Sequence, residues 1–301
     1  MTEWILPALL SPFLFSIVTL VDKRILSHYK LNLSSFNLFV GLSQGIIGVI
    51  ILFVYPIGFV DWSVFFRGTL TGIIQGVALI IMFWMLKRED PTRVMPIMQT
   101  SPLFVALLAW PFFGEMLSFI QWAAVIIAIS GGILVSIGRR RFEDKTTIRP
   151  IFFLLFISAA LIGISQLVIK SITTDLISLH IVALRGIGLC TMMFFVFGRK
   201  DSAHDLFNFL KFPKRAVLLI SVEGITPFIC HLLTTFAISI GPVSLVATMF
   251  GVRPIFVFLL SLLGARFMAK FVYEKFSKNE LKVKLLSSVA VFLAIALMSF
   301  G

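Results

Sequence analysis

The chain has 301 residues, of which 59% are hydrophobic and 13% carry a charge, and its mean hydropathy is +1.05. Soluble domains carry about 25% charged residues, so this composition excludes a soluble globular protein and predicts an integral membrane protein. The net charge of +12 would favour nucleic acid in a soluble chain, but here the basic residues flank apolar runs, where they anchor and orient membrane helices. We therefore expect membrane lipids around the chain and no nucleic-acid partner.

The hydrophobic residues fall in runs of about 20, the length that a helix needs to cross a hydrocarbon core about 30 Å thick. These runs are too long for the strands of a membrane barrel, and their polarity does not alternate. We therefore predict an all-α integral membrane protein with ten transmembrane helices. The predicted spans are residues 4–21, 35–57, 65–86, 91–113, 117–137, 151–169, 176–197, 216–240, 242–264 and 284–300.

Two stretches of the chain share an order of motifs. A turn dipeptide that ends in proline begins each stretch, at Pro91 and at Pro242. A second proline follows inside each span, Pro102 in the first and Pro254 in the second, and Leu-Phe or Ile-Phe and then a pair of leucines come after it. The chain is therefore interpreted as two copies of one unit.

The basic segment 138–150 is the natural boundary between the two copies. Five predicted spans lie on each side of it, in residues 1–137 and in residues 151–301. An odd number of spans makes the second copy enter the membrane from the opposite side. We therefore expect two inverted five-helix repeats, an arrangement that is common among secondary transporters.

The distribution of Lys and Arg predicts an orientation. The connections after spans one, three, five, seven and nine hold 22 of these residues, whereas the other connections hold only Arg67 and Lys170. Positive charge marks the cytoplasmic side, so both termini are expected to face away from the cytoplasm.

Three charged residues lie well inside predicted spans: Arg185, Arg253 and Glu223. A charge at the centre of a membrane helix costs about 2.5–3.5 kcal/mol, so these residues are candidates for function. The arginines could bind a carboxylate or phosphate, and Glu223 could bind an amine or carry a proton. Arg253 is the stronger candidate, because Pro254 interrupts its helix. In the structural alternative, Glu223 forms a buried ion pair with one of the arginines.

Further polar residues complete the predicted substrate-binding set. His231 shares a helix face with Glu223, since the two are eight residues apart in a series of three- and four-residue steps. Gln44, Gln75 and Gln99 lie in spans two, three and four. The alternative for each of these residues is a packing role, in which it forms a hydrogen bond between helices.

Polar residues at the ends of spans are assigned to anchoring and capping. Asp22 lies just after the first predicted span, where interfacial pairing is the simplest role. Glu115 is expected to cap the turn between spans four and five. The segments 198–215 and 265–283 mix Phe with Lys or Arg at helical spacing, and we expect them to lie in the membrane interface.

The sequence lacks the motifs of enzyme chemistry. No HExxH helix, glycine-rich phosphate loop or GxSxG elbow occurs, and the four histidines are scattered without metal-ligand spacing. Cys190 and Cys230 both fall inside spans, so a disulfide framework is not expected. We therefore predict a protein that is not an enzyme and needs no cofactor or metal.

The order of these motifs resembles the EamA-like branch of the drug/metabolite transporter superfamily. The resemblance rests on the five-plus-five spans, on Asp22-Lys23 after the first span, and on a proline-led fourth helix that ends in Gly114-Glu115 before a glycine-rich fifth. It implies a secondary transporter of small metabolites with a cavity shared by the two repeats. The chain departs from the family in having Gly264-Ala265 at the corresponding turn. Its charge distribution also opposes the cytoplasmic termini that are usual in the family.

Together these observations predict a secondary transporter that works by alternating access across a bacterial or archaeal cell membrane. Its expected substrate is a small polar metabolite, either an amino acid or an organic or phosphorylated anion, and a proton could drive it. Two alternatives stay open: movement of a lipid-linked anionic substrate between leaflets, or a membrane binding or assembly role without transport. Both a monomer and a homodimer are compatible with the sequence.

Overall fold

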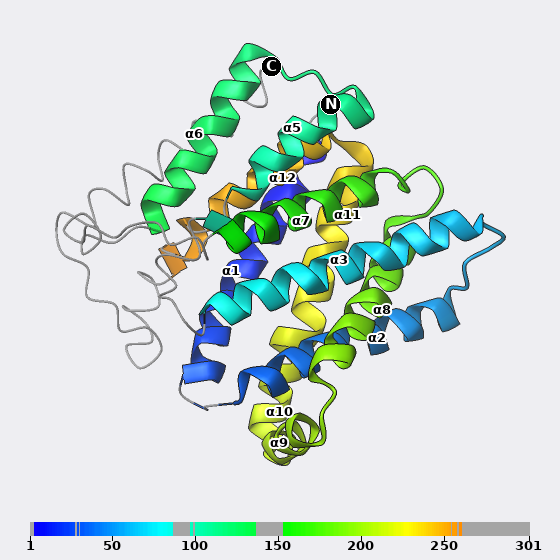
Figure 1. Ribbon diagram of the computed structural model, residues 1–301, viewed down its shortest axis with the longest axis vertical. Coiled ribbons are helices and arrows are strands. Elements are labelled where there is room, and N and C mark those ends of the chain that lie inside the picture. The colour runs from blue at the N-terminus through cyan, green and yellow to red at the C-terminus, as the bar shows by residue number, and fades with distance from the viewer. Residues whose placement is uncertain are drawn as a thin grey trace.

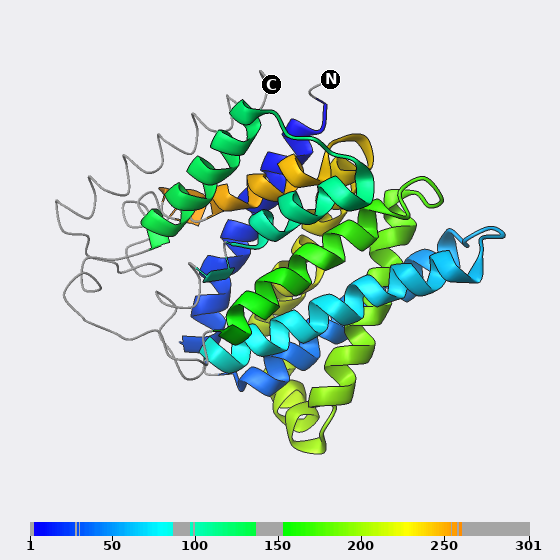
Figure 2. The same ribbon diagram turned by 45° about the horizontal axis from the view of Figure 1, so that its top comes forward.

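The computed structural model describes residues 3–27, 29, 31–86, 97–98, 100–136, 153–253, 255–257 and 259–260, and these residues form helices and short connections. Figures 1 and 2 show long helices packed side by side, with α9 and α10 together at one end of the bundle. The elements are α1 (Ile5–Ser27), α2 (Leu33–Val54), α3 (Trp62–Leu86), α5 (Ser101–Phe113), α6 (Phe119–Ser136), α7 (Phe153–Lys170), α8 (Ser178–Phe197), α9 (Lys200–Leu210), α10 (Pro213–Leu219), the π-helical η3 (Ile220–Ile225), α11 (Thr226–Ile240), α12 (Val243–Met249) and the 3₁₀-helical η4 (Phe250–Val252).

Helices occur at nine of the ten predicted spans, while the tenth, 284–300, lies outside the described residues. Within the described part of the chain, six segments are long and apolar enough to cross a membrane: Ile5–Asp22, Leu33–Val54, Trp62–Met85, Phe153–Lys170, Ser178–Phe197 and Pro213–Ile240. The all-helical membrane fold is therefore confirmed, and the inverted relation of two repeats stays a prediction. Helix α1 continues to Ser27, past the predicted end at residue 21, so that Asp22 lies inside it. The predicted interfacial segment 198–215 contains α9, whereas 265–283 lies outside the described residues.

Local sequence signals explain where several helices begin and end. The side chain of Asn32 caps α2 by accepting a hydrogen bond from the Ser34 backbone N–H, at 3.2 Å. Ser118 and Gln121 form a reciprocal capping box at the start of α6, with bonds of 2.9 and 3.2 Å. Gly114 ends α5 with φ at 66°, in the left-handed region that favours glycine. The predicted turn after α5 is thus confirmed.

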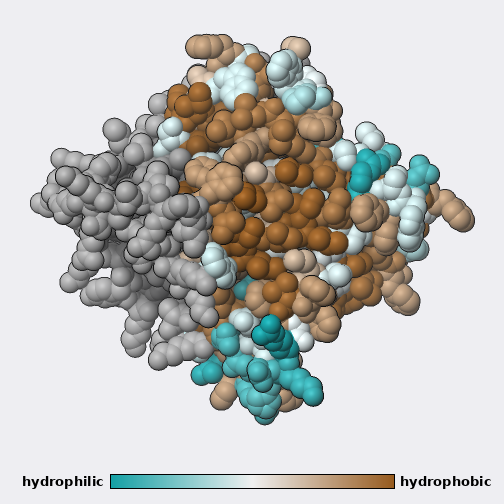
Figure 3. Space-filling view, in the orientation of Figure 1, coloured by the Kyte–Doolittle hydropathy of each residue, from teal (hydrophilic) through white to brown (hydrophobic). Residues whose placement is uncertain are grey.

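The outer surface of the bundle is apolar. Large side chains such as Phe53, Phe119 and Phe195 are 88%, 88% and 87% exposed. Figure 3 shows a broad hydrophobic band across one face, with hydrophilic residues gathered toward its edges. Monomeric soluble proteins rarely expose apolar patches of this extent, whereas a lipid bilayer solvates them. The chain is an integral membrane protein.

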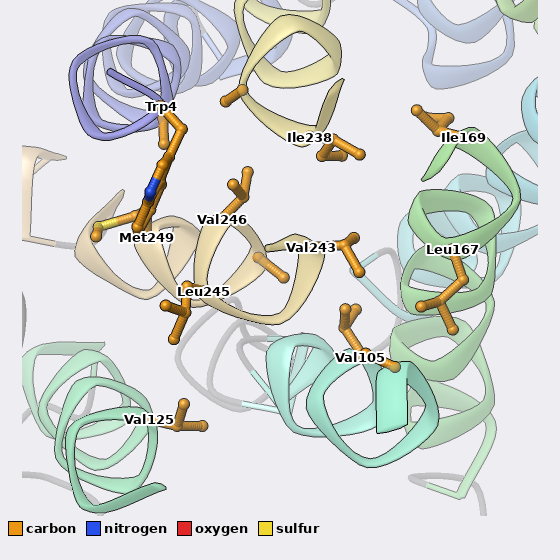
Figure 4. Close-up of a cluster of buried hydrophobic side chains, with 14 of the residues drawn as sticks. Trp4, Val105, Val125, Leu167, Ile169, Ile238, Val243, Leu245, Val246 and Met249 are labelled. Atoms are coloured by element: carbon orange, nitrogen blue, oxygen red, sulfur yellow. The ribbon is translucent and has the colours of Figure 1, made fainter. Parts of the chain in front are cut away.

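The main hydrophobic core surrounds α12. Val243, Val246 and Met249 of this short helix are fully buried. Figure 4 shows side chains from several other helices turned toward it: Trp4, Val105, Val125, Leu167, Ile169 and Ile238. Because these residues come from both halves of the sequence, the core joins the two halves into one body.

Glycines bring α8 into direct backbone contact with α2 and α3. A methyl group added at Gly188 of α8 would overlap the backbone carbonyl oxygen of Thr69 of α3. A methyl group added at Gly72 of α3 would overlap the backbone carbonyl oxygen of Arg185 of α8. On the other side, a methyl group at Gly48 of α2 would lie 2.5 Å from the Ala183 oxygen. Small residues permit such close approach of helices in lipid, where apolar burial adds little to association. We call this contact the glycine seam.

Two charged side chains fix the turn between α11 and α12. Lys170, at the end of α7, donates from Nζ to the carbonyl oxygens of Ile238 and Gly241, both at 2.8 Å. The Glu115 carboxylate accepts from the backbone N–H groups of Val243 and Ser244, at 2.8 and 3.1 Å, and from the Ser244 hydroxyl at 2.6 Å. Each charge lies where the helix dipole favours it, the cation at a C-terminus and the anion at an N-terminus. The prediction that Glu115 caps its own turn is wrong: it caps α12 instead.

Glu115→Gln is expected to lower the free energy of unfolding by roughly 1–3 kcal/mol, because an amide loses the charge and turns a donor toward the N–H groups of α12. The thermal unfolding midpoint of the purified protein in detergent measures this effect. Glu3→Gln is the matched control, since Glu3 is exposed. Equal midpoints for the two variants would show that the Glu115 contacts contribute nothing to stability.

Candidate functional site

Arg185 lies at the centre of a buried polar cluster. Its side chain, on α8, is only 2% exposed. Its Nε donates to Oε1 of Gln75 on α3 at 2.8 Å, and its Nη2 donates to the same oxygen and to Nε2 of His231 on α11, the latter at 2.9 Å. Its Nη1 is buried and has no hydrogen-bond partner. The described partners of this guanidinium group are therefore neutral, and part of its donor capacity is unused.

The bond from Arg185 fixes the protonation of His231. An arginine has only donors, so Nε2 of His231 must accept and the ring proton must lie on Nδ1. The His231 ring packs edge-on against Phe15 of α1, with ring centroids 5.0 Å apart. His231 is therefore held as a neutral hydrogen-bond acceptor beside the guanidinium group.

Phe15 connects this cluster to a second one around Arg253. The Arg253 guanidinium lies 5.1 Å from the centre of the Phe15 ring, and its Nη2 donates to the Thr19 hydroxyl at 2.6 Å. The Ser16 hydroxyl donates to the Arg253 carbonyl oxygen at 3.2 Å. Arg253 is thus held along one face of α1, in a cation–π arrangement with Phe15.

Glu223 brings a carboxyl group to the second cluster. It lies in the π-helical segment η3, is 4% exposed, and its side chain lies within hydrogen-bonding reach of that of Asp22 on α1. One oxygen of each carboxyl group is buried without a hydrogen-bond partner. Arg253 lies close enough to attract both carboxyl groups electrostatically. π-Helical turns occur frequently at functional sites, where they place a side chain outside the regular helix spacing.

Gln44 holds the backbone of η3 in place. Its Nε2 donates to the backbone carbonyl oxygen of Gly224 at 2.8 Å. The neighbouring Ser43 hydroxyl donates to the backbone carbonyl oxygen of Glu223 at 3.4 Å. These bonds satisfy carbonyl groups that a break in regular helix geometry would otherwise leave unpaired. Gln44 therefore supports the position of Glu223 without contacting either arginine in a described hydrogen bond.

Most of the predicted site residues lie in one network. Gln75, Arg185 and His231 form its first cluster, Arg253 and Glu223 belong to its second, and Gln44 lies at its margin. Gln99 lies outside the described residues. The described side chains of Glu223 and of the two arginines form no ion pair within 4.0 Å, although Arg253 lies near enough to influence Glu223 electrostatically. Among the described residues, no three His, Cys, Asp or Glu side chains gather as metal ligands.

Three residues of α1 were not predicted as part of the site: Phe15, Thr19 and Asp22. Their spacing of four and then three residues places them on one helix face. That spacing is visible in the sequence, but a first span that ends at residue 21 leaves Asp22 outside the helix. Because α1 continues to Ser27, Asp22 lies within the helix instead of after it, and one of its carboxyl oxygens is buried.

The family model of the EamA-like transporters matches residues 2–137. Over these residues, which make up a little under half of the chain, the chain is similar to the EamA-like transporters. A crystal structure described only as that of a protein is 14% identical to the chain and covers 99% of it and 96% of its own length, with a TM-score of 0.71. At this identity the likeness shows the fold alone, and that fold extends over both halves of the chain. No curated protein matches the chain.

This similarity is to a family of transporters embedded in the membrane. It is consistent with the position of the polar network, which lies between helices of both halves: α1 and α3 from the first, and α8, η3 and α11 from the second. The similarity does not identify a substrate, so the class of substrate has to be inferred from the chemistry of the polar network.

Proposed function

We propose that this EamA-like protein is a secondary transporter of a small polar metabolite that carries at least one anionic group, such as an amino acid or an organic or phosphorylated acid. The observation that carries the proposal is the environment of Arg185. Its guanidinium group is buried among neutral partners and keeps Nη1 unpaired. A buried charge is costly without an opposite charge, and the planar guanidinium fork matches the oxygens of carboxylate and phosphate. A substrate anion would provide the missing charge.

The charges near the two arginines favour Arg185 over Arg253 as the anion site. Arg253 is already near the carboxyl groups of Asp22 and Glu223. The sequence favoured Arg253 because of Pro254, but a guanidinium with acidic neighbours has less to gain from an anionic substrate. In this proposal Gln75 and His231 orient Arg185, while Arg253 and Glu223 bind a second part of the substrate, such as an amine, or a proton.

We further propose that residues 1–137 and 151–301 are inverted repeats joined by 138–150, and that they alternate access to the site. The contacts between helices support this symmetry. If α1, α2, α3 and α5 correspond to α7, α8, α11 and α12, the α1–α11 contact becomes the α7–α3 contact. The α2–α8 and α5–α12 contacts each map onto themselves, as they would beside a twofold axis. The described residues contain both members of each of these pairs.

Flux into proteoliposomes tests the proposed function. A panel of amino acids, organic acids and sugar phosphates is first screened for thermal stabilisation of the purified protein, since a ligand that binds only the folded state raises its stability. Uptake of the stabilising compounds is then compared between liposomes with and without the protein. Stabilisation only by cations would contradict the anion site, and binding without flux would favour a non-transporting role. Stabilisation by lipid-linked anions alone would favour movement of lipids between leaflets.

A further inference from the structure

Two carboxyl groups from opposite halves of the chain lie close together within the helix bundle. Asp22 belongs to α1 and Glu223 to η3, these two elements are in contact, and the two side chains lie within hydrogen-bonding reach of each other. A carboxylate has no donor, so two carboxyl groups this close can form a hydrogen bond with each other only when one of them carries a proton. Each group also keeps one buried oxygen without a partner. The arrangement therefore has the capacity to hold a proton between the two residues.

Arg253 supplies the positive charge of this cluster. Its Nη2 bonds to the Thr19 hydroxyl, one helical turn before Asp22 on the same face of α1. Two ionised carboxylates beside one guanidinium carry a net charge of minus one, whereas the addition of one proton makes the cluster neutral. Among the described side chains, the other titratable groups near it are Cys230 and His231 of α11. His231 is held as a neutral acceptor by Arg185.

We propose that Asp22 and Glu223 together bind the proton that couples transport, with Arg253 as their counter-charge. This inference rests on the proposed transporter function and adds Asp22 to its site. On binding, a lone pair of one carboxylate oxygen forms an O–H bond with a proton from water on the open side. On release, the proton returns to water and the electron pair stays on that oxygen. No other reactant takes part.

Charge balance gives the pair its coupling role. A net charge away from water is costly in the low dielectric of the membrane interior, so the neutral, protonated cluster is favoured when the site is closed. The deprotonated cluster needs contact with water or with a cationic group of the substrate. The two carboxyl groups lie on different halves of the chain, and the shared proton therefore holds α1 and η3 together. Release of the proton removes this link and leaves two like charges that repel each other.

Infrared difference spectroscopy of the purified, lipid-reconstituted protein tests the pair directly, with protons and deuterons as the probe. We expect the parent protein to show a protonated-carboxyl band at neutral pH that shifts in D₂O. Asp22→Asn and Glu223→Gln should each abolish the band, because the single remaining carboxylate then balances Arg253 without a proton. Asp22→Glu should keep it, since it preserves both carboxyl groups.

Asp201→Asn is the control, because Asp201 is exposed on α9, and it should leave the band unchanged. Persistence of the full band in both Asp22→Asn and Glu223→Gln, or its absence from the parent protein, would overturn the proposed pair. Gel filtration of each variant checks folding, and Asp22→Glu provides a second measurement if Asp22→Asn does not fold. The band does not depend on a substrate, so its loss or persistence is separate from the outcome of the flux assay.

Discussion

Arg185→Gln is expected to weaken binding of the anionic ligand by about 10- to 150-fold, since a hydrogen bond to a charged group contributes about 1.5–3 kcal/mol. Glutamine removes both the charge and the unpaired Nη1 donor. It also removes a buried charge whose described partners are neutral, so the thermal unfolding midpoint without ligand should stay equal or rise. Opposite changes in binding and in stability are characteristic of a residue kept for function. Ligand-dependent thermal shifts and equilibrium binding measure both quantities.

Two further variants control the Arg185 experiment. Arg185→Lys keeps the charge but loses the planar fork, so its affinity should fall between those of the parent and Arg185→Gln. Arg67→Gln removes an arginine near the start of α3, whose Nη1 donates to the Ser171 carbonyl oxygen at 3.1 Å. This variant should bind the ligand as tightly as the parent protein does. If folded Arg185→Gln binds the ligand with unchanged affinity, the assignment of the anion site to Arg185 is wrong.

Gly188→Ala is expected to produce the largest loss of stability. The added methyl group would overlap the Thr69 carbonyl oxygen, and a backbone atom cannot move aside without a shift of α3 against α8. Overpacking of a tight contact costs about 1–3 kcal/mol, and the cost is greater where only backbone can yield. Fluorescence-detected gel filtration after heating gives the unfolding midpoint and the yield of folded protein.

Gly58→Ala is the matched control for the glycine seam. Gly58 lies in the connection between α2 and α3, and a methyl group there meets nothing within 4 Å. The two variants make the same chemical change, so a difference between their midpoints reports the close helix contact alone. A Gly188→Ala protein as stable as Gly58→Ala would mean that α3 and α8 separate readily.

The sequence predicted the fold well because membrane helices depend on local composition. Helices occur at nine of the ten spans predicted from apolar runs, and the turn motif at Gly114 marks the end of α5. Charged residues inside spans also identified Arg185, Arg253 and Glu223, since burial of charge in lipid is costly wherever it occurs. These predictions needed no knowledge of which helices are neighbours.

What the sequence could not predict depends on contacts between distant segments. Asp22 looked like an anchoring residue because its partner, Glu223, is about 200 residues away in the sequence. Glu115 looked like a cap for its own turn because the N-terminus of α12 is brought to it only by folding. The π-helical turn η3 has no simple sequence signal, and it changes the direction of Glu223 relative to the rest of the helix face.

The glycine seam restricts which parts of the molecule can move. Helices in contact through carbonyl oxygens and glycine Cα atoms interlock at fixed heights, so α8 cannot slide along α2 or α3 without a clash of main chains. We infer that these three helices move as a rigid body during transport. Shear is easier between α5 and α12, where side chains such as Val105 and Val243 fill the interface and can change rotamer. The two halves would then slide where they meet through side chains, at the contact of α5 with α12, while the glycine seam would stay rigid.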